Sequence, residues 1–246
     1  MSEREIIILD SAEDAYVRAA EEIAHVAGEA ICTHAEFLFC LAGGSTPAKV
    51  YELMASRFHL SIDWKEVQFF FGDERCVPPD DAASNFAMAS RTVLSKLDLK
   101  LTQVHRIRGE EAPAKAAELY EDELRRSFGI GEGELPRFDL ILLGLGDNRH
   151  TASLFPGSPA IHENERLAVA VEVEDRHRNR VTLTPAVINN AERVMFLVTG
   201  EGKAEAVKDV IEGSTSVEQA PAKIVAPTDG VALWILDRAA ASLLSK

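Results

Sequence analysis

The 246-residue sequence lacks several features that mark particular classes of protein. No apolar run approaches the roughly 20 residues that a membrane-spanning helix needs. The opening Met-Ser-Glu-Arg-Glu is charged, and no signal-peptide core follows it. The three cysteines, Cys32, Cys40 and Cys76, form no Cys-x-x-Cys pair, which favours a reducing compartment. We therefore expect a cytoplasmic protein that has no membrane partner.

Basic residues are also scarce: 26 Lys and Arg stand against 40 Asp and Glu, and the net charge is −14. This balance argues against nucleic acid as a partner. No H-E-x-x-H motif or Cys/His cluster has metal-ligand spacing, and no G-x-G-x-x-G dinucleotide motif occurs. We expect neither a metal nor a cofactor. An anionic ligand would need basic residues that are gathered locally.

Apolar runs alternate with helical patterns along the chain, which predicts a mostly parallel sheet with helices on both faces. The expected strands are 6–9, 37–42, 67–71, 138–143, 193–199 and 231–236, with shorter candidates at 167–173 and 181–183. The expected helices include 112–128, 203–211 and a closing helix at 238–244. Because no repeat or long linker divides the chain, we predict one Rossmann-like α/β domain over residues 1–246.

The loop 43–47, Gly-Gly-Ser-Thr-Pro, joins an expected strand to an expected helix. Thr46 suits the N-cap of that helix, and Pro47 suits its first position. The preceding glycines leave backbone N–H groups bare, so an anion can bind where the helix begins. The alternative is a tight turn with ordinary capping.

The most informative stretch is L-G-L-G-D-N-R-H-T-A-S-L-F-P-G at residues 143–157. A buried strand ends there at two glycines, and polar residues up to His150 follow. Ligands of open α/β sheets bind outside the carboxyl ends of the strands, and an imidazole titrates near neutral pH. His150 is therefore the candidate catalytic residue, with a purely structural histidine as the alternative.

Other charged residues also stand at the ends of expected elements. Asp73 and Arg75 follow the strand 67–71, where they either orient sugar hydroxyls or form a solvated strand end. Arg180 begins the segment R-V-T-L-T-P. Lys203 begins an expected helix, where a cation opposes the helix dipole and gains from a nearby anion. An ordinary surface lysine is the alternative for Lys203.

Six segments in order resemble the 6-phosphogluconolactonase family across essentially the whole chain. The family signature is usually written G-x-G-x-D-G-H-T-A-S-L-F-P-G. The matching segments are L-A-G-G-S-T-P (41–47), F-G-D-E-R-C-V-P (71–78), S-N-F (84–86), H-T-A-S-L-F-P-G (150–157), R-V-T-L-T (180–184) and T-G-E-G-K-A (199–204). The resemblance implies a fold shared with glucosamine-6-phosphate deaminase and ribose-5-phosphate isomerase. It also implies metal-independent hydrolysis of 6-phospho-D-glucono-1,5-lactone to 6-phospho-D-gluconate, in the oxidative pentose phosphate pathway.

The resemblance also assigns roles to residues. It implies that the sugar phosphate is bound by Gly43, Gly44, Ser45, Thr46, Arg180 and Lys203, while Asp73 and Arg75 face the sugar and the lactone. His150 would be the general base that activates water and would then protonate the leaving ring oxygen. An imidazole with the ordinary pKa near 6.5 suits this role. The donor to the developing oxyanion is either Arg75 or a loop N–H near Gly146.

The chain departs from the family signature at Asn148 and Arg149, where the family usually has Asp and Gly. An amide cannot take a proton at neutral pH, so Asn148 can orient water or substrate but cannot be the base. If position 149 needs a positive φ, a residue other than glycine costs about 1–2 kcal/mol there. We consider two roles for Arg149: its charge lowers the pKa of His150, or its side chain points into solvent.

Three other functions compete with an active lactonase. A glucosamine-6-phosphate deaminase/isomerase should have Asp-Glu-Tyr where Asp73, Glu74 and Arg75 stand, and an A-F-N-E-P-G-like segment at 152–157. A sugar-sensing transcription regulator needs a DNA-binding motif, and the strand expected at 6–9 leaves no room for one before it. A weakly active sugar-phosphate-binding relative is suggested by the two departures. For the oligomeric state, a monomer and a weak dimer both stay open.

Overall fold

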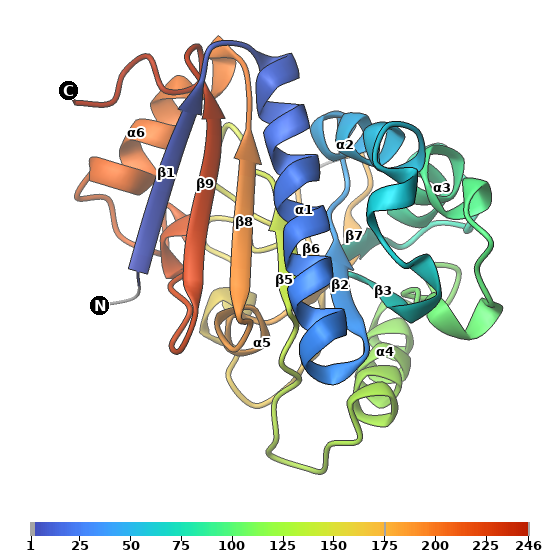
Figure 1. Ribbon diagram of the computed structural model, residues 1–246. Coiled ribbons are helices and arrows are strands. Elements are labelled where there is room, and N and C mark those ends of the chain that lie inside the picture. Colours follow the sequence, from blue (N-terminus) through green and yellow to red (C-terminus); the bar gives the residue numbers. More distant parts are fainter. Residues whose placement is uncertain (1–2, 175, 246) are drawn as a thin grey trace.

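The apolar runs become the strands of a six-stranded sheet in the computed structural model, which describes residues 3–174 and 176–245 (Figure 1). Every neighbouring pair in this sheet is parallel. Its strands are, in spatial order, β1 (Glu3–Leu9), β9 (Val231–Asp237), β8 (Arg193–Val198), β5 (Leu140–Leu143), β2 (Phe37–Leu41) and β3 (Val67–Phe71). The predicted mostly parallel α/β fold is thereby confirmed.

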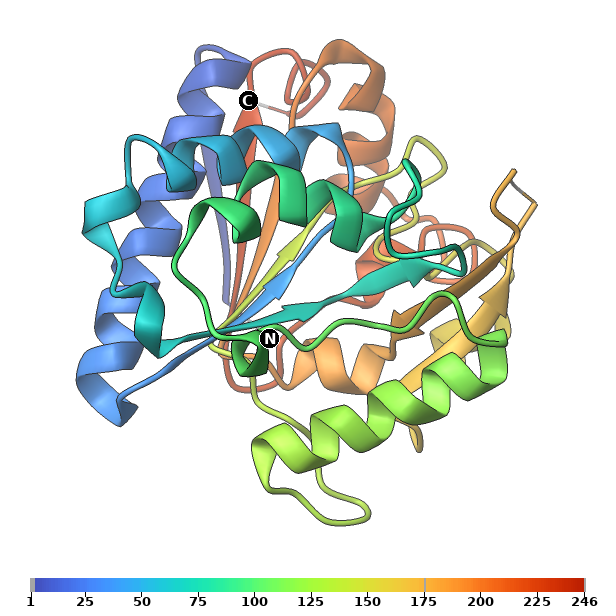
Figure 2. The same ribbon diagram turned by 90° about the vertical axis from the view of Figure 1, so that its right-hand side faces the viewer.

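A second, smaller sheet continues from β3 after the single residue Gly72. It has three antiparallel strands in the order β4 (Asp73–Arg75), β7 (Asn179–Leu183) and β6 (Ala168–Glu172). The helix α4 (Pro113–Phe128) packs against β6 and β7 (Figure 2). The antiparallel pairing places Arg75 of β4 directly opposite Arg180 of β7. Two residues that lie far apart in sequence thus meet beside the carboxyl end of β3.

Helices cover both faces of the parallel sheet, with α1 and α2 on one side and α5 and α6 on the other (Figures 1 and 2). The helices besides α4 are α1 (Ala12–His34), α2 (Ser45–Ala55), α3 (Asn85–Thr92), α5 (Pro185–Asn189) and α6 (Ala204–Glu212). Short 3-10 helices span His59–Ser61, Trp64–Glu66, Leu94–Lys96, Leu101–Gln103, Pro159–His162, Glu201–Lys203 and Pro221–Ile224. No helix in the described part of the chain has the length and apolar character needed to cross a membrane.

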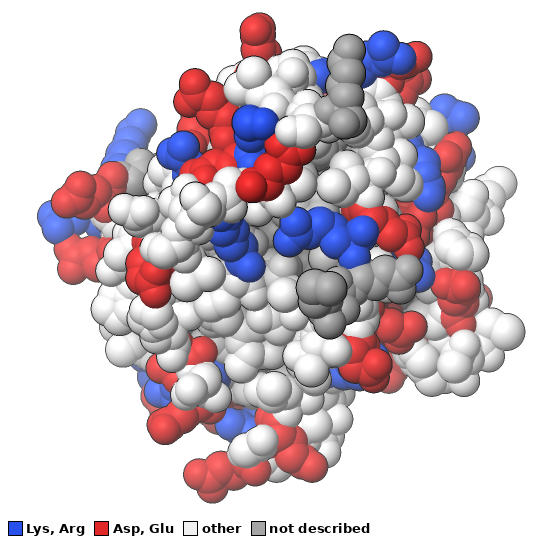
Figure 3. Space-filling view, turned by 90° about the vertical axis from the view of Figure 1, so that its left-hand side faces the viewer, with Lys and Arg blue, Asp and Glu red and all other residues white. Residues whose placement is uncertain are grey.

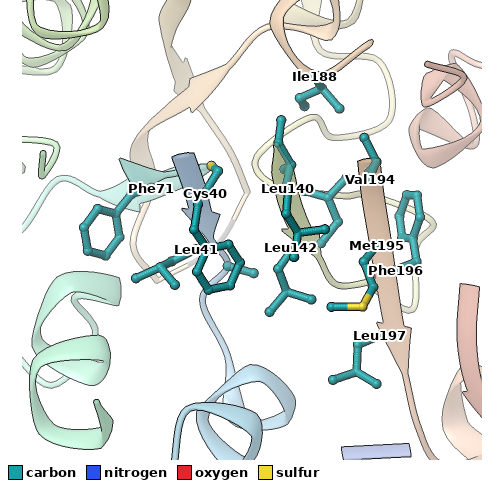
Figure 4. Close-up of a cluster of buried hydrophobic side chains, with 14 of the residues drawn as sticks. Cys40, Leu41, Phe71, Leu140, Leu142, Ile188, Val194, Met195, Phe196 and Leu197 are labelled. Carbon is teal, nitrogen blue, oxygen red and sulfur yellow. The ribbon is translucent and has the colours of Figure 1, made fainter. Parts of the chain in front are cut away.

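The core lies between the parallel sheet and its helices. Because both faces of the sheet are covered, its central strands carry continuous apolar runs, and every residue of β5 is buried. Figure 4 shows side chains of neighbouring strands packed together, among them Leu140, Leu142, Met195 and Phe196. Burying one such side chain contributes about 1.5–3 kcal/mol. This packing makes the sheet a rigid support for the loops at its carboxyl edge.

Two local predictions are wrong. The N-cap of α2 is Gly44 rather than Thr46, because the positive φ of 108° at Gly44 turns the chain so that the helix begins at Ser45. The expected helix at 238–244 is a series of turns, with mostly i to i+3 bonds such as Leu244 N–H to Ala241 C=O. There the Asp237 carboxylate accepts from the backbone N–H groups of Gly200 and Ala240, which holds the end of β9 in a turn.

Charges on the surface around β1 and α6 are mixed in sign. In the face that Figure 3 shows, Lys and Arg side chains lie beside Asp and Glu side chains. On that face the negative groups interrupt the positive ones. A polyanion binds to a continuous basic surface, which this face does not offer.

Candidate active site

The loops that follow β2, β3 and β5 meet at the carboxyl edge of the parallel sheet and enclose a cavity of about 220 Å³. This volume is just below the ~300–1,000 Å³ typical of sites for drug-sized ligands, and it suits a small sugar phosphate. Seven of the residues predicted for the site line it: Gly43, Gly44, Asp73, Arg75, His150, Arg180 and Lys203. The chain therefore brings together, in one cavity, residues from five of the six family-like segments.

A larger cavity of about 830 Å³ lies beside this one, along β6. Its lining includes Asn148 and Phe155, and it also includes Glu163, Glu172 and Glu174. No Lys or Arg is among the described residues that line it. A phosphate therefore fits the smaller cavity better, although the larger one is roomier.

The loop 43–47 supplies backbone donors rather than side chains. Helix geometry leaves the first N–H groups of α2, including those of Ser45 and Thr46, without intrahelical partners. The Ser45 and Thr46 side chains are not part of the cavity lining, and Ser45 is exposed. Gly43 has to be glycine because a Cβ there would lie 2.0 Å from Oδ1 of Asn85. The loop therefore offers an anion main-chain donors rather than side chains.

Two cations also line the cavity. Arg180 is buried in β7, its Nε donates to the His177 carbonyl (3.3 Å), and its guanidinium carbon lies 5.1 Å from the centre of the Phe155 ring. Lys203 precedes α6, and its Nζ lies 2.5 Å from Oδ1 of Asp147. These side chains concentrate positive charge in an otherwise acidic protein.

His150 is held by contacts on several sides. Its imidazole stacks on the Phe155 ring, with centroids 4.1 Å apart and planes 15° apart. A Cβ at residue 146 would lie 2.0 Å from Nδ1 of His150, so only glycine leaves room for the imidazole there. The second glycine of the loop 144–150 is therefore required by the close approach of the histidine.

Asn148 fixes which nitrogen of His150 carries the proton. Oδ1 of Asn148 lies 3.3 Å from the backbone N of His150 and 2.5 Å from its ring Nδ1. Since a backbone N–H can only donate, the Asn148 atom that it faces is the amide oxygen, which accepts. The ring Nδ1 facing the same oxygen must then be protonated, and Nε2 keeps its lone pair. Asn148 thus orients the histidine, a contact that the sequence did not reveal.

The pKa of His150 is lowered to about 4, and the main cause is burial of the imidazole. The negative charges of Asp73 and Asp147 raise this pKa, whereas the positive charges of Arg180 and Lys203 lower it further. The expected ordinary value near 6.5 is therefore wrong for the folded protein. At neutral pH the imidazole is neutral.

The segment 73–75 uses its three charged side chains in different ways. Asp73 is buried, and its carboxylate accepts from Oγ of Ser153 (2.6 Å) and Nδ2 of Asn85 (3.1 Å). The Glu74 carboxylate accepts from backbone N–H groups at the start of α3, including that of Asn85 (2.7 Å). Burial raises the pKa of Glu74. Nη1 of Arg75 donates to a backbone carbonyl, and its buried Nε has no hydrogen-bond partner among the described residues.

Three residues of the site were missed by the sequence reasoning as individual contributors. Asn85 touches both Gly43 and Asp73, Ser153 donates to Asp73, and Phe155 supports the His150 ring. Each lies inside a family-like segment, and this was the only available signal. Among the residues that the structure describes, no group of His, Cys, Asp or Glu could hold a metal ion.

Comparisons with known proteins agree on a family. The family model described as glucosamine-6-phosphate isomerases/6-phosphogluconolactonase matches residues 10–234. A curated 6-phosphogluconolactonase of Synechocystis is 38% identical over 213 residues, which are 86% of this chain and 86% of that protein. The solved 6-phosphogluconolactonase from Trypanosoma cruzi superposes with a TM-score of 0.88 at 31% identity, covering 100% of this chain and 99% of the other.

A monomeric glucosamine-6-phosphate deaminase also superposes, with a TM-score of 0.82 at 23% identity over 97% of this chain and 99% of that one. This likeness concerns the fold alone. The Synechocystis and Trypanosoma cruzi proteins, which are similar in sequence over most of the chain, are both named 6-phosphogluconolactonase.

Proposed function

The chain belongs to the family of glucosamine-6-phosphate isomerases and 6-phosphogluconolactonases, and on this premise we propose that it hydrolyses 6-phospho-D-glucono-1,5-lactone to 6-phospho-D-gluconate. The enzyme is a 6-phosphogluconolactonase. One observation carries the proposed mechanism: an oriented, neutral histidine lines the same small cavity as two cations and a glycine-rich helix start.

His150 acts as the general base. The Nδ1 proton is donated to Oδ1 of Asn148, so Nε2 is the nitrogen that is free to accept a proton. Nε2 takes this proton from water while the water oxygen bonds to the lactone carbonyl carbon. As the tetrahedral intermediate collapses, the bond from that carbon to the ring oxygen breaks. The proton on Nε2 then passes to the ring oxygen, which leaves as a hydroxyl, and His150 is neutral again. No metal takes part in the steps that we propose.

The low pKa of about 4 keeps His150 ready to accept a proton throughout the neutral range. When the imidazole becomes charged during the reaction, the nearby carboxylate of Asp73 offsets that charge. A base with a low pKa is intrinsically weak, but a lactone is an activated ester. Asp73, which is buried and accepts from Ser153, therefore stabilises the imidazolium form of His150 during the reaction.

The phosphate binds between the start of α2 and the side chains of Arg180 and Lys203. Backbone N–H groups at a helix start and charged side chains together make a strong site for a dianion. Lys203 is paired with Asp147 in the structure, so the incoming phosphate competes with that carboxylate for the ammonium group.

Arg75 is the better of the two candidates for binding the developing oxyanion. The N–H of Gly146 already donates to the His150 carbonyl, at 2.9 Å. Arg75 lines the cavity, and a guanidinium carries five N–H donors, so it can donate to a substrate oxygen as well as to the Ala83 carbonyl. A donor aimed at the developing charge supports catalysis of acyl transfer.

The test is a direct assay on the purified protein. The lactone is generated in situ, acid release is followed, and glucosamine 6-phosphate is supplied in a parallel reaction with ammonia as the readout. We expect rapid lactone hydrolysis, no ammonia and the same rate after dialysis against a chelator. Ammonia release would support the deaminase instead, a background hydrolysis rate would support a binding relative, and loss after chelation would contradict the metal-free mechanism.

A further inference from the structure

Arg149 has a backbone conformation that side chains other than glycine rarely adopt. Its φ is +68°, and it directly precedes His150. Three contacts hold it: its N–H donates to the Gly146 carbonyl (2.9 Å), its carbonyl accepts from the Ala222 N–H (3.0 Å), and its Nε donates to Oδ2 of Asp209 (2.9 Å). Such a conformation persists only where the surroundings hold it in place.

Asp209 is itself firmly anchored on α6. Its other carboxylate oxygen accepts from the hydroxyl of Thr215, and its side chain is only 17% exposed. Nζ of Lys223 donates to the carbonyls of Gly213 (2.7 Å) and Thr215 (2.8 Å), which closes the segment after α6. The guanidinium of Arg149 therefore binds to a rigid part of the domain rather than extending into solvent.

The side chains of the loop alternate in what they contact. Asp147 and Arg149 reach Lys203 and Asp209, at the start and the middle of α6, whereas Asn148 and His150 face each other. The loop that carries the proposed base thus has one contact with Lys203, just before α6, and one with Asp209 within α6. A phosphate that binds Lys203 competes with Asp147 for the ammonium group. Of these two contacts, the one between Arg149 and Asp209 is then the one that stays in place.

We propose that Arg149 and Asp209 form a positioning pair that sets where His150 lies relative to the phosphate site. This inference rests on the proposed function. The pair holds the left-handed turn at residue 149, and that turn directs the imidazole onto Gly146 and Phe155. A substrate held by its phosphate then keeps its lactone carbonyl carbon at a fixed distance from Nε2 of His150. Small misplacement of a reacting group costs up to about 100-fold in rate.

The variants Arg149→Gly and Asp209→Asn test the pair. We expect each to lower kcat by about 10–100-fold and to leave KM within about threefold, because the phosphate ligands are intact. Arg149→Gly removes both the ion pair and the backbone strain. If strain were the only role of Arg149, this variant would keep its kcat. Arg149→Lys, which keeps the charge, should recover part of the rate. The double variant should be no worse than either single variant.

The pKa of His150, followed by NMR of its ring protons, is a second readout that needs no turnover. The charged groups around the ring are Asp73, Asp147, Arg180 and Lys203, and none of them is changed. A loosened loop exposes the imidazole to water, so the pKa should rise from about 4 toward 6.5. The acidic limb of kcat/KM should move up with it.

Lys208→Ala is the matched control, because it removes an exposed ion pair with Glu212 from the same helix. It should change neither kcat nor the pKa. An unchanged kcat and an unchanged His150 pKa in both Arg149→Gly and Asp209→Asn would overturn the positioning pair. The proposed function fails on a different result, namely only background lactone hydrolysis by the unaltered protein.

Discussion

The two glycine-rich loops at the carboxyl edge of the sheet have similar positions but opposite designs. The loop 43–47 contributes backbone N–H groups at the start of α2, and its Ser and Thr side chains stay outside the cavity lining. The loop 144–150 contributes side chains, and each of its four polar residues has a specific partner. In one loop a glycine leaves room for Asn85, and in the other for His150.

The difference teaches how each loop should respond to mutation. A main-chain site tolerates changes of side chain and fails when an N–H is removed or the backbone is displaced. A side-chain site fails when one functional group is changed, even if the backbone is preserved. Substitutions in the two loops can therefore separate binding of the phosphate from chemistry at the lactone.

The largest effect is expected at His150. Replacing it by Asn removes the base, so kcat should fall by about 10²–10⁴-fold while 6-phosphogluconate still binds. Steady-state kinetics and calorimetry measure the two quantities. His25→Asn, at an exposed position of α1, is the control and should be neutral. A His150→Asn enzyme that keeps more than about a tenth of the wild-type kcat would show that the base is elsewhere.

Next come the two cations that line the cavity together with Gly43 and Gly44. Loss of one charge-assisted hydrogen bond costs about 1.5–3 kcal/mol, so Arg180→Ala and Lys203→Ala should each weaken 6-phosphogluconate binding by about 10–150-fold. The loss should nearly vanish for gluconolactone without the phosphate. Lys115→Ala, on the exposed side of α4, serves as the control. Equal losses for both ligands would mean that these residues support the structure instead.

A moderate effect, on pH dependence, is expected from Asn148→Asp. A carboxylate facing Nδ1 favours the imidazolium form, so the pKa of His150 should rise from about 4 by roughly 1–3 units. The base works only when neutral, so the acidic limb of kcat/KM moves up and activity is lost at mildly acid pH. Profiles from pH 4 to 8 measure this. Asn164→Asp adds the same charge at an exposed position and should leave the acidic limb in place. If the acidic limb did not move in Asn148→Asp, the contact between Asn148 and His150 would be contradicted.

The smallest effect is expected in the loop 43–47, and it is the sharpest test of the contrast. Ser45→Ala should change 6-phosphogluconate affinity by no more than about threefold, because the hydroxyl is outside the cavity lining. Ser45→Pro keeps a residue that the first helical position accepts but removes its N–H, and it should cost about tenfold or more. If both variants lost the same affinity, the side chain and not the backbone would bind the phosphate.

The sheet could be predicted because parallel strands buried on both faces are continuous apolar runs. The edge at which the candidate site lies followed from the glycines and polar residues at the ends of those runs. The segment 238–244 misled the prediction because its apolar spacing suits a helix, while the turn is set by Asp237 contacting Gly200, a residue distant in sequence.

The details of the site could not be predicted, for a related reason. The partner of Arg149 is Asp209, whose place beside the loop depends on the packing of α6. The low pKa of His150 arises mainly from burial, which is a property of the folded chain and not of a motif. Asn85 contacts Gly43, and the two residues belong to different family-like segments. Sequence similarity identified both segments but did not show that they are in contact.

The position of β1 has a consequence for how the domain is made. In the sheet, β1 stands at one edge and its neighbour is β9, the last strand of the chain. The Arg238 side chain binds Asp10 across 228 residues of sequence. During synthesis β1 therefore waits until β9 has been made before the two can pair, and contacts of such long range slow folding. We expect β1 to be the last part of the sheet to form and the first to be released when the chain is shortened before Val231.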